Sequence, residues 1–294
     1  MIPNEQSTFG RPVARNRLVK DRLALMAMYG AVIVSIIPLV LIVWFLVVRG
    51  VGAMSWEFLT SSQPLTYVRP GGGALNALVG TAYMVGLASL ISIPIGIAAA
   101  VYLNEYGRGA FAVAVRFFTD VMTGVPSVFV GLFVFTLLIL ETPLGFSAIA
   151  GGTALSLIML PIVIRSTEEI LKLVPQPLRD ASYALGATKA RTTMRVVLPA
   201  ARSGIATGVM LAVARAAGET APLIMTALGS VQLVTKWAAP ISALPLYIYD
   251  GARNPFPAGQ ERAFAAAAEL VAIVLILTVI ARWLASRQPK GARP

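Results

Sequence analysis

The sequence contains no cysteine and no histidine. Disulfide bonds, thiol nucleophiles, zinc sites built from cysteine and histidine, and catalytic triads that rely on histidine are therefore excluded for this chain. The sequence also lacks the G-x-x-x-x-G-K-[ST] phosphate-binding loop, a common signature of a nucleotide-hydrolysing site. If the protein works with ATP, another chain must hydrolyse it.

Charged residues are scarce as well. Only 13% of the residues are charged, whereas 57% are hydrophobic and the mean hydropathy is +0.79. A soluble domain usually carries about 25% charged residues, so most of this protein's surface faces lipid. A net charge of +11 often indicates nucleic-acid binding, but here the basic residues sit between apolar segments. Membrane topology explains them better, and we expect no nucleic-acid partner.

The apolar residues gather in runs long enough to cross a bilayer, which takes roughly 20 residues in a helix. These runs predict an all-α integral membrane protein with six transmembrane helices. The first run is too long for the apolar part of a signal peptide, so we expect it to remain in the protein. The expected spans are Leu23–Val48, Ala74–Tyr102, Phe117–Leu140, Phe146–Ile164, Ser203–Leu228 and Ala263–Ala285.

Lysine and arginine are unevenly distributed over the connecting segments. With the N-terminus in the cytoplasm, 18 of the 24 basic residues fall on the cytoplasmic side and 5 outside. Cytoplasmic loops carry such an excess, so both termini are predicted to be cytoplasmic. Residues 1–22 then form a basic tail before the span at 23–48, residues 286–294 form a second tail, and residues 165–202 form the longest cytoplasmic loop.

The loop 165–202 has the pattern of two short helices. Pro175 and Pro177 are expected to stop the helix that leaves the fourth span. Asp180 is expected to start a short helix, because an acidic side chain suits the N-terminal end of the helix dipole. This helix would continue to Leu185 and end at Gly186, since glycine commonly follows a helix C-terminus.

A second short helix is expected after this glycine. Thr188 can cap it, and it would run to Leu198, with Pro199 opening the approach to the fifth span. A short helix can dock into a groove of another protein, with Tyr183 and Leu185 as apolar anchors. The alternative is a solvated connector between two spans, and the residues alone leave both open.

The run D-A-S-Y-A-L-G-A resembles the EAA loop of permeases from ATP-binding cassette (ABC) importers. Asp180 stands where that family has Glu, Ala181 matches, and Ser182 stands where it has a second Ala. Gly186 matches, and Pro199 follows it at the family's spacing. The resemblance implies that this loop holds the coupling helix, which fits a cleft on an ATPase subunit.

Three further stretches narrow the resemblance to the A-type permeases of phosphate-specific transport (Pst) systems. The similarity covers roughly residues 70–285 and implies a permease core with the type I ABC importer fold. The stretches are Gly124-Val-Pro-Ser-Val-Phe-Val-Gly131, Leu160-Pro-Ile-Val-Ile-Arg-Ser-Thr-Glu-Glu169 and Ala214-Arg-Ala-Ala-Gly-Glu-Thr-Ala-Pro222.

The resemblance also implies partners. A second, similar permease subunit, two ATPase subunits that bind ATP and Mg²⁺, and an extracytoplasmic phosphate-binding protein would complete the complex. The chain itself would bind no cofactor and catalyse no reaction. It would be a multi-pass protein of a bacterial or archaeal plasma membrane.

Charged groups inside a span usually face a partner or a water-filled path, because burying them in lipid is costly. Arg215 and Glu219 lie four residues apart in the fifth span, so they can pair on one helix face. They form either a structural ion pair or part of an anion pathway, in which the guanidinium binds phosphate oxygens. Arg165, otherwise an anchor at the cytoplasmic end of the fourth span, and Thr220 are further candidates along this pathway.

Three prolines lie inside predicted spans: Pro94, Pro126 and Pro161. Each removes a backbone hydrogen bond and can kink its helix. Such kinks either shape a substrate cavity or are tolerated through packing.

Three other functions compete with phosphate import by an ABC system. The first is an ABC permease for another oxyanion, such as sulfate or molybdate. The second is an ion-coupled secondary transporter that uses Arg215 and Glu219 as a relay, although such a carrier needs no docking loop. The third, an intramembrane enzyme, is disfavoured by the absence of histidine and cysteine and by the few carboxylates within the spans.

Overall fold

The computed structural model describes residues 15–286. The expected C-terminal tail and the first part of the N-terminal tail lie outside the described residues, apart from residue 286 at the end of the last helix. The chain separates into two units, residues 1–48 and 49–294. In the first unit, helix α1 (Arg15–Leu46) begins before the predicted start at Leu23. Its large hydrophobic side chains are exposed all round, as expected of a helix that lies in lipid.

The second unit is built from helices. Its α-helices are α2 (Trp56–Thr60), α3 (Leu75–Val101), α4 (Ala110–Gly124), α5 (Ser127–Val134), α6 (Ala148–Lys172), α7 (Gln176–Ala184), α8 (Lys189–Thr192), α9 (Leu198–Ala217), α10 (Ala221–Thr226), α11 (Leu244–Ala252) and α12 (Pro257–Ser286). Short π-helices adjoin several of them: η1 (Val47–Val51, across the boundary of the units), η2 (Tyr102–Tyr106), η3 (Phe135–Leu140) and η4 (Thr193–Val197). A helix satisfies its own backbone hydrogen bonds, which a span in lipid requires.

Five described helices are long and apolar enough to cross a membrane, and a bent pair makes a sixth candidate. The bent pair replaces the straight third span predicted over Phe117–Leu140. Helix α4 and the segment from α5 to η3 meet at 105°. Pro126 lacks an N–H and pushes Val125 into extended backbone, so the chain turns sharply at this point.

The other spans differ from the prediction at their ends. Helix α6 continues two turns beyond Ile164 to Lys172, and α12 already begins at Pro257. The fifth span, expected to reach Leu228, ends at Ala217, and α10 follows after a short break. Pro94 and Pro161 lie inside α3 and α6, and both helices continue through them.

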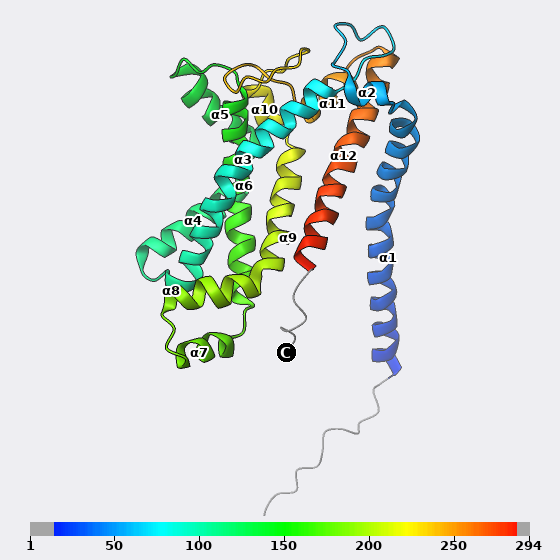
Figure 1. The fold of residues 1–294 in the computed structure, drawn as a ribbon. Helices are drawn as coiled ribbons and strands as arrows, with labels where there is room; N and C mark the ends of the chain where they lie inside the picture. The colour runs from blue at the N-terminus through cyan, green and yellow to red at the C-terminus, as the bar shows by residue number, and fades with distance from the viewer. Residues whose placement is uncertain (1–14, 287–294) are drawn as a thin grey trace, which may run out of the picture. The chain divides into compact units, whose positions relative to one another are not determined.

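Helix α6 lies at the centre of the second unit, between α3 and α9 (Figure 1). Small residues let the helices approach closely, as is common in membranes. A Cβ added at Gly96 of α3 would lie 2.7 Å from Val163, and one at Gly208 of α9 would lie 2.5 Å from Ser166. The interface is therefore tight, and movement of α6 has to involve its neighbours.

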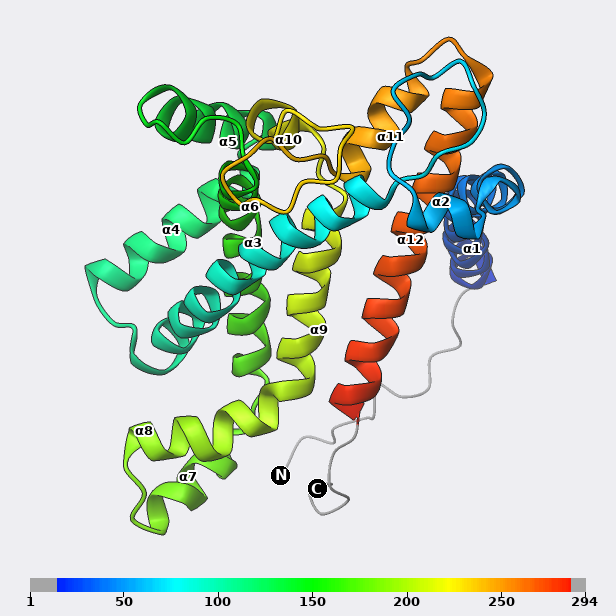
Figure 2. The same ribbon diagram turned by 45° about the horizontal axis from the view of Figure 1, so that its top comes forward.

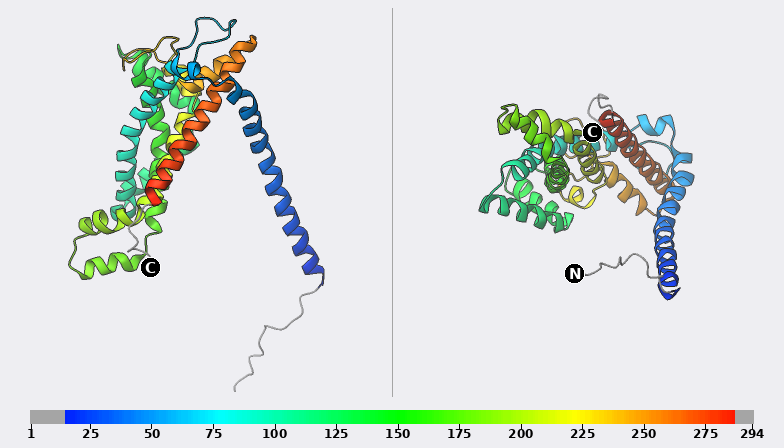
Figure 3. Two further views of the ribbon diagram at one scale, coloured as in Figure 1. Left: turned by 45° about the vertical axis from the view of Figure 1, so that its right-hand side comes forward. Right: turned by 90° about the horizontal axis from the view of Figure 1, so that it is seen from below.

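The second unit has two distinct ends (Figure 3). Helices α7 and α8 lie at one end, which we call the docking end. Helices α2 and α11, with the segments at residues 61–74 and 227–243, lie at the opposite end, which we call the distal end. Helix α6 begins at the distal end, where the backbone of Ser147 and Ile149 bonds Thr226 and Trp237, and runs to the docking end.

Candidate functional site

The loop with the EAA-like run forms a helix that begins earlier than predicted. Helix α7 starts at Gln176 rather than at Asp180, with Pro175 as its N-cap. Pro177 lies in the first turn, where a missing N–H costs nothing. The prolines therefore end α6 as predicted but also start α7, and Asp180 lies inside the helix, where it accepts a hydrogen bond from Gln176 at 3.0 Å.

Gly186 ends α7 as predicted, in a left-handed conformation with φ +77°. Its N–H donates to the carbonyl of Tyr183, and the N–H of Ala187 donates to that of Ser182. This is the Schellman arrangement that closes many helices, and it favours glycine because a Cβ is strained at this φ. The turn sets the direction in which the chain leaves α7.

The second helix of the loop is joined to the first. Thr188 caps α8 by accepting a hydrogen bond from the N–H of Arg191, and the hydroxyls of Ser182 and Thr192 lie 2.9 Å apart. The chain then passes through η4 and turns into α9 at Leu198–Pro199 (Figure 2). The helix expected to end at Leu198 thus continues into the fifth span.

Apolar side chains of this region are exposed. Leu185 is 89% and Tyr183 is 37% exposed. Leu173 and Met194, close to α7 in sequence, are also exposed. The two predicted anchors are therefore free to contact another protein.

A second candidate site lies at the break between α4 and α5. A cavity of about 60 Å³ opens there, several times the ~10–15 Å³ that one water molecule needs. It brings together Arg215 of α9, Pro161 of α6 and the hydroxyl-bearing residues Thr123 and Ser127 on the two sides of the break. The remaining lining residues are apolar, apart from backbone groups: Met122, Val125, Val130, Leu157, Ile158 and Ile162.

Two positive elements meet at this cavity. Helix α5 begins at Ser127 without a side-chain cap, so its first N–H groups and the positive end of its dipole lie there. The Arg215 side chain is 62% exposed, and its Nε lies 3.6 Å from Oε1 of Glu219. The predicted pair therefore forms, although α9 ends at Ala217 and Glu219 lies beyond it. Thr220 does not line this cavity.

Arg165 lies apart from this cavity. It follows the lining residue Ile162 by about one turn of α6, toward the docking end. Its guanidinium lies 3.7 Å from Asp120 of α4 and 3.9 Å from Glu169, and its side chain is half exposed. The structure thus places Arg165 and Arg215 at different levels rather than in one site.

The stretches around Gly131 and Pro222 pack against each other. A Cβ on Gly131 of α5 would lie 2.7 Å from the Cα of Pro222 in α10. This close approach fixes α5, the second half of the broken span, against the segment that follows Arg215.

The sequence analysis missed two ion pairs with buried carboxylates at the docking end. Nε of Arg116 in α4 lies 3.0 Å from Oε1 of Glu168, which is 1% exposed, and Nη2 donates to the carbonyl of Leu103. Arg179 of α7 pairs with Glu105 of η2 at 3.0 Å. The only sequence signal was that these residues are charged, because each pair joins positions far apart in the chain.

A second buried arginine, besides Arg179, lies at the distal end. Arg262 of α12 donates to the backbone carbonyls of Thr66, Arg69 and Gly71. It thereby ties the segment at residues 61–74 to α12. Burial raises the pKa of neighbouring Tyr247 to about 12, so this phenol stays neutral.

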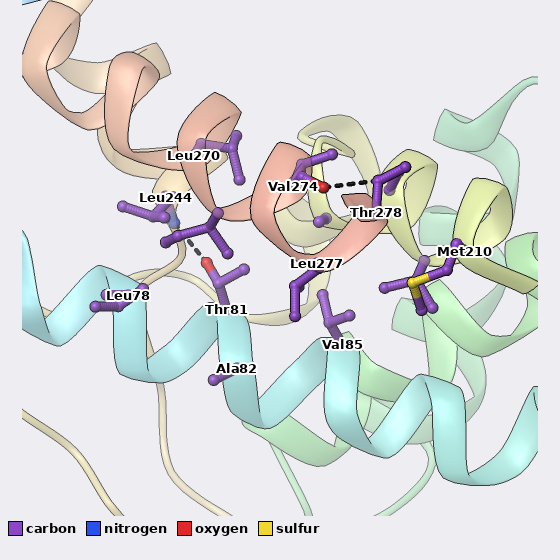
Figure 4. A pocket seen from close by; sticks show the side chains of 14 residues that line it. Leu78, Thr81, Ala82, Val85, Met210, Leu244, Leu270, Val274, Leu277 and Thr278 are labelled. Atoms are coloured by element: carbon purple, nitrogen blue, oxygen red, sulfur yellow. Dashed lines mark hydrogen bonds between the residues drawn. The ribbon is translucent and has the colours of Figure 1, made fainter. Parts of the chain in front are cut away.

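A larger cavity lies between α3, α9, α11 and α12 (Figure 4). Its volume is about 220 Å³, and no charged side chain lines it. Its hydroxyls come from Thr81, which accepts from the N–H of Leu244, and Thr278, which donates to the carbonyl of Val274. An anion would find no positive partner there, so this cavity is not a candidate for anion passage.

Residues 92–290 match the model of the family described as binding-protein-dependent transport system inner membrane component. Among curated proteins, the phosphate transport system permease protein PstA of Haemophilus influenzae is 42% identical over 90% of this chain and 94% of its own length. PstA 1 of Mycobacterium tuberculosis (strain CDC 1551 / Oshkosh) is 38% identical over 95% of this chain and 93% of its own.

Solved structures share the fold. A chain of a bacterial alginate ABC transporter, solved with a periplasmic protein bound to an alginate pentasaccharide, aligns over 92% of this chain and 96% of its own. The TM-score is 0.67 at 17% identity. A chain of the MetNI methionine ABC transporter aligns over 72% of this chain and 94% of its own, with a TM-score of 0.57 at 18% identity.

Proposed function

The chain belongs to the family of inner-membrane components of binding-protein-dependent transport systems, and we propose that it is the channel-forming permease subunit of an ATP-driven importer of inorganic phosphate. Its curated relatives, about 40% identical over most of both chains, are phosphate transport permeases. The chain supplies the path across the membrane, and a separate ATPase subunit holds ATP and Mg²⁺ and performs the hydrolysis.

Members of this family are multi-pass proteins of the inner membrane that work with an ATPase and a binding protein. In the finer arrangement that we propose, this chain pairs with a second, similar permease. Two ATPase subunits contact the docking ends, with Tyr183 of α7 and Leu185 directly after it as anchors. A phosphate-binding protein contacts the distal ends from outside the cell.

The observation that carries the phosphate pathway is the position of Arg215 at the cavity in the broken span. A guanidinium can bind two phosphate oxygens at once, and the hydroxyls of Thr123 and Ser127 can donate to further oxygens. The start of α5 adds a positive dipole end. Glu219 holds Arg215 when no anion is present, and phosphate competes with this carboxylate as it passes.

Arg165 forms a second stage of the proposed pathway, one turn of α6 closer to the docking end. Its contacts with Asp120 and Glu169 are long, at 3.7 and 3.9 Å, so an anion can replace them at little cost. Thr220 contributes between α9 and α10 rather than in the cavity. Docking of the ATP-bound ATPase at α7 favours one of two conformations of the path, and hydrolysis favours the other.

Uptake by the reconstituted complex tests this pathway. Liposomes hold the complete transporter with ATP inside and phosphate-loaded binding protein outside. Replacing Arg215→Gln should lower phosphate uptake by about tenfold to a hundredfold, because a charged hydrogen bond is lost. Arg202→Gln is the matched control, since it removes an exposed arginine from the other end of α9.

Three outcomes would contradict parts of the proposal. Unchanged uptake by Arg215→Gln, with the ATPase still bound, would remove Arg215 from the pathway. Uptake of sulfate or molybdate instead of phosphate by the wild type would assign another oxyanion. Uptake that persists with a hydrolysis-deficient ATPase would favour an ion-coupled carrier.

A further inference from the structure

The helix that carries the EAA-like run is joined to the membrane helices by one buried guanidinium. Arg179 lies in α7, and its side chain is only 10% exposed, whereas Leu185 of the same region is 89% exposed. Its Nη2 lies 3.0 Å from Oε1 of Glu105, whose side chain is 6% exposed. Glu105 belongs to η2, which prolongs α3 at the docking end.

The same guanidinium also contacts the end of α6. Nη2 donates to the carbonyl of Leu171 at 3.1 Å, and Nη1 donates to the carbonyl of Val174. Leu171 lies in the last turn of α6 and Val174 just beyond it, where carbonyls lack their usual i+4 helical partners. Arg179 therefore fixes α7 to α3 through η2 and to α6 directly, with its planar group held in one orientation by three acceptors.

No other side-chain hydrogen bond of α7 in the described part of the chain provides this link. Among the described residues, the other side-chain bond that leaves α7 joins Ser182 to Thr192 of α8, which belongs to the same loop. Helix α7 otherwise packs on α8 and η4. A push on α7 thus reaches α3 through Arg179, and it reaches α6 through Arg179 as well as through the short connection at residues 173–175.

The receiving helices lead to the candidate pathway. Ile158, Pro161 and Ile162 of α6 line the cavity that contains Arg215. Helix α3 moves with α6, because Gly96 and Val163 are in close contact. A displacement of α7 therefore changes the wall of this cavity if the joint at Arg179 is rigid.

We propose that Arg179 and Glu105 form the joint that transmits movement of the docked ATPase from α7 to α3 and α6. The inference rests on the proposed function and adds positioning residues to it. Buried ion pairs are often replaceable by apolar residues without loss of stability. We assign the pair a mechanical role instead: it makes α7, α3 and α6 move together.

The test measures coupling rather than stability. The complete transporter is reconstituted in liposomes, and phosphate uptake and ATP hydrolysis are recorded in the same preparation. In Arg179→Met and Glu105→Met, the ATPase should still bind and hydrolyse ATP, while phosphate imported per ATP falls by about tenfold. Arg108→Met is the matched control, because it removes an exposed arginine at the same end and should leave the ratio unchanged.

The double variant Arg179→Met/Glu105→Met separates a joint from a merely structural pair. It leaves no buried charge without a partner, so the fold should recover even if the single variants assemble poorly. A joint predicts that the double variant remains uncoupled. Import per ATP at the wild-type level would overturn the proposal, and so would loss of the ATPase from the double variant, since the pair would then only shape the docking surface.

The same experiment distinguishes a failure of the proposed function from a failure of the proposed joint. A wild-type complex that imports another oxyanion changes the substrate but leaves the coupling ratio measurable with that anion. A wild-type chain that neither binds an ATPase nor needs ATP overturns the proposed function and this inference together.

Discussion

The arginines of this protein differ in how exposed their side chains are, and we connect this difference with different roles. Arg179 and Arg262 are buried, and each donates hydrogen bonds to three carbonyl or carboxylate acceptors. Arg215 is 62% exposed and has one carboxylate partner at 3.6 Å. Removing a buried arginine strands its partners, whereas removing Arg215 leaves the surrounding packing intact. A variant of Arg215 therefore reports on transport. For a buried arginine with a charged partner, a variant that replaces both residues is needed as well.

Gly186 offers a test of the docking loop at the same scale. A Cβ at this position meets nothing within 4 Å, so Gly186→Ala adds backbone strain of about 1–2 kcal/mol and no clash. We expect α7 to leave its position more often, and binding of the ATPase to weaken by about tenfold. Co-purification of the ATPase with the membrane subunits, titrated by salt, measures this.

Gly86→Ala is the control for this substitution. Gly86 also has nothing within 4 Å, but it lies inside α3 without a positive φ. Alanine favours a helix interior by about 1 kcal/mol over glycine, so binding should not change. Equal binding by both variants would show that the turn at Gly186 does not determine docking.

At the scale of elements, the broken span is the feature that shapes the candidate pathway. Gly131→Ala should push α5 away from Pro222, because the new Cβ would lie 2.7 Å from a backbone atom. Overpacking of this kind costs about 1–3 kcal/mol. We expect a lower thermal stability of the detergent-purified complex, together with slower phosphate uptake.

Gly124, on the other side of the break between α4 and α5, provides the control for Gly131→Ala. A Cβ at Gly124, the last residue of α4, meets nothing within 4 Å. Gly124→Ala should therefore leave both melting temperature and uptake near those of the wild type. If Gly131→Ala behaves in the same way, α5 does not depend on its packing against α10.

The elements differ in how far the sequence predicts them. The long apolar runs predict the spans, since lipid leaves a helix as the favoured state of each run. The sharp turn at Pro126 could not be predicted in this way. The residues on both sides of it are apolar, and hydropathy does not show whether an apolar run is straight or bent. Gly186 was predictable as a helix end, since its role is local. The partners of Arg179 and Arg116 were not, because Glu105 and Glu168 are 74 and 52 positions away in the chain.

At the scale of the whole molecule, the distribution of basic residues predicts which end faces the cytoplasm. The docking end carries the loop 165–202, and the distal end carries the segment at residues 61–74. Because the chain has no cysteine, a single introduced cysteine is the only thiol that a reagent can label. Leu185 is 89% and Leu65 is 88% exposed, so the two positions form a matched pair at opposite ends.

We expect a membrane-impermeant maleimide to label Leu65→Cys in intact cells and Leu185→Cys only after the membrane is opened. The permease is expressed without its ATPase, so that docking does not shield position 185. The physical reason is the positive-inside bias, which holds the basic docking end in the cytoplasm. Labelling of Leu185→Cys but not Leu65→Cys in intact cells would reverse the orientation, and the exposed face of α7 would then lie on the side without ATP.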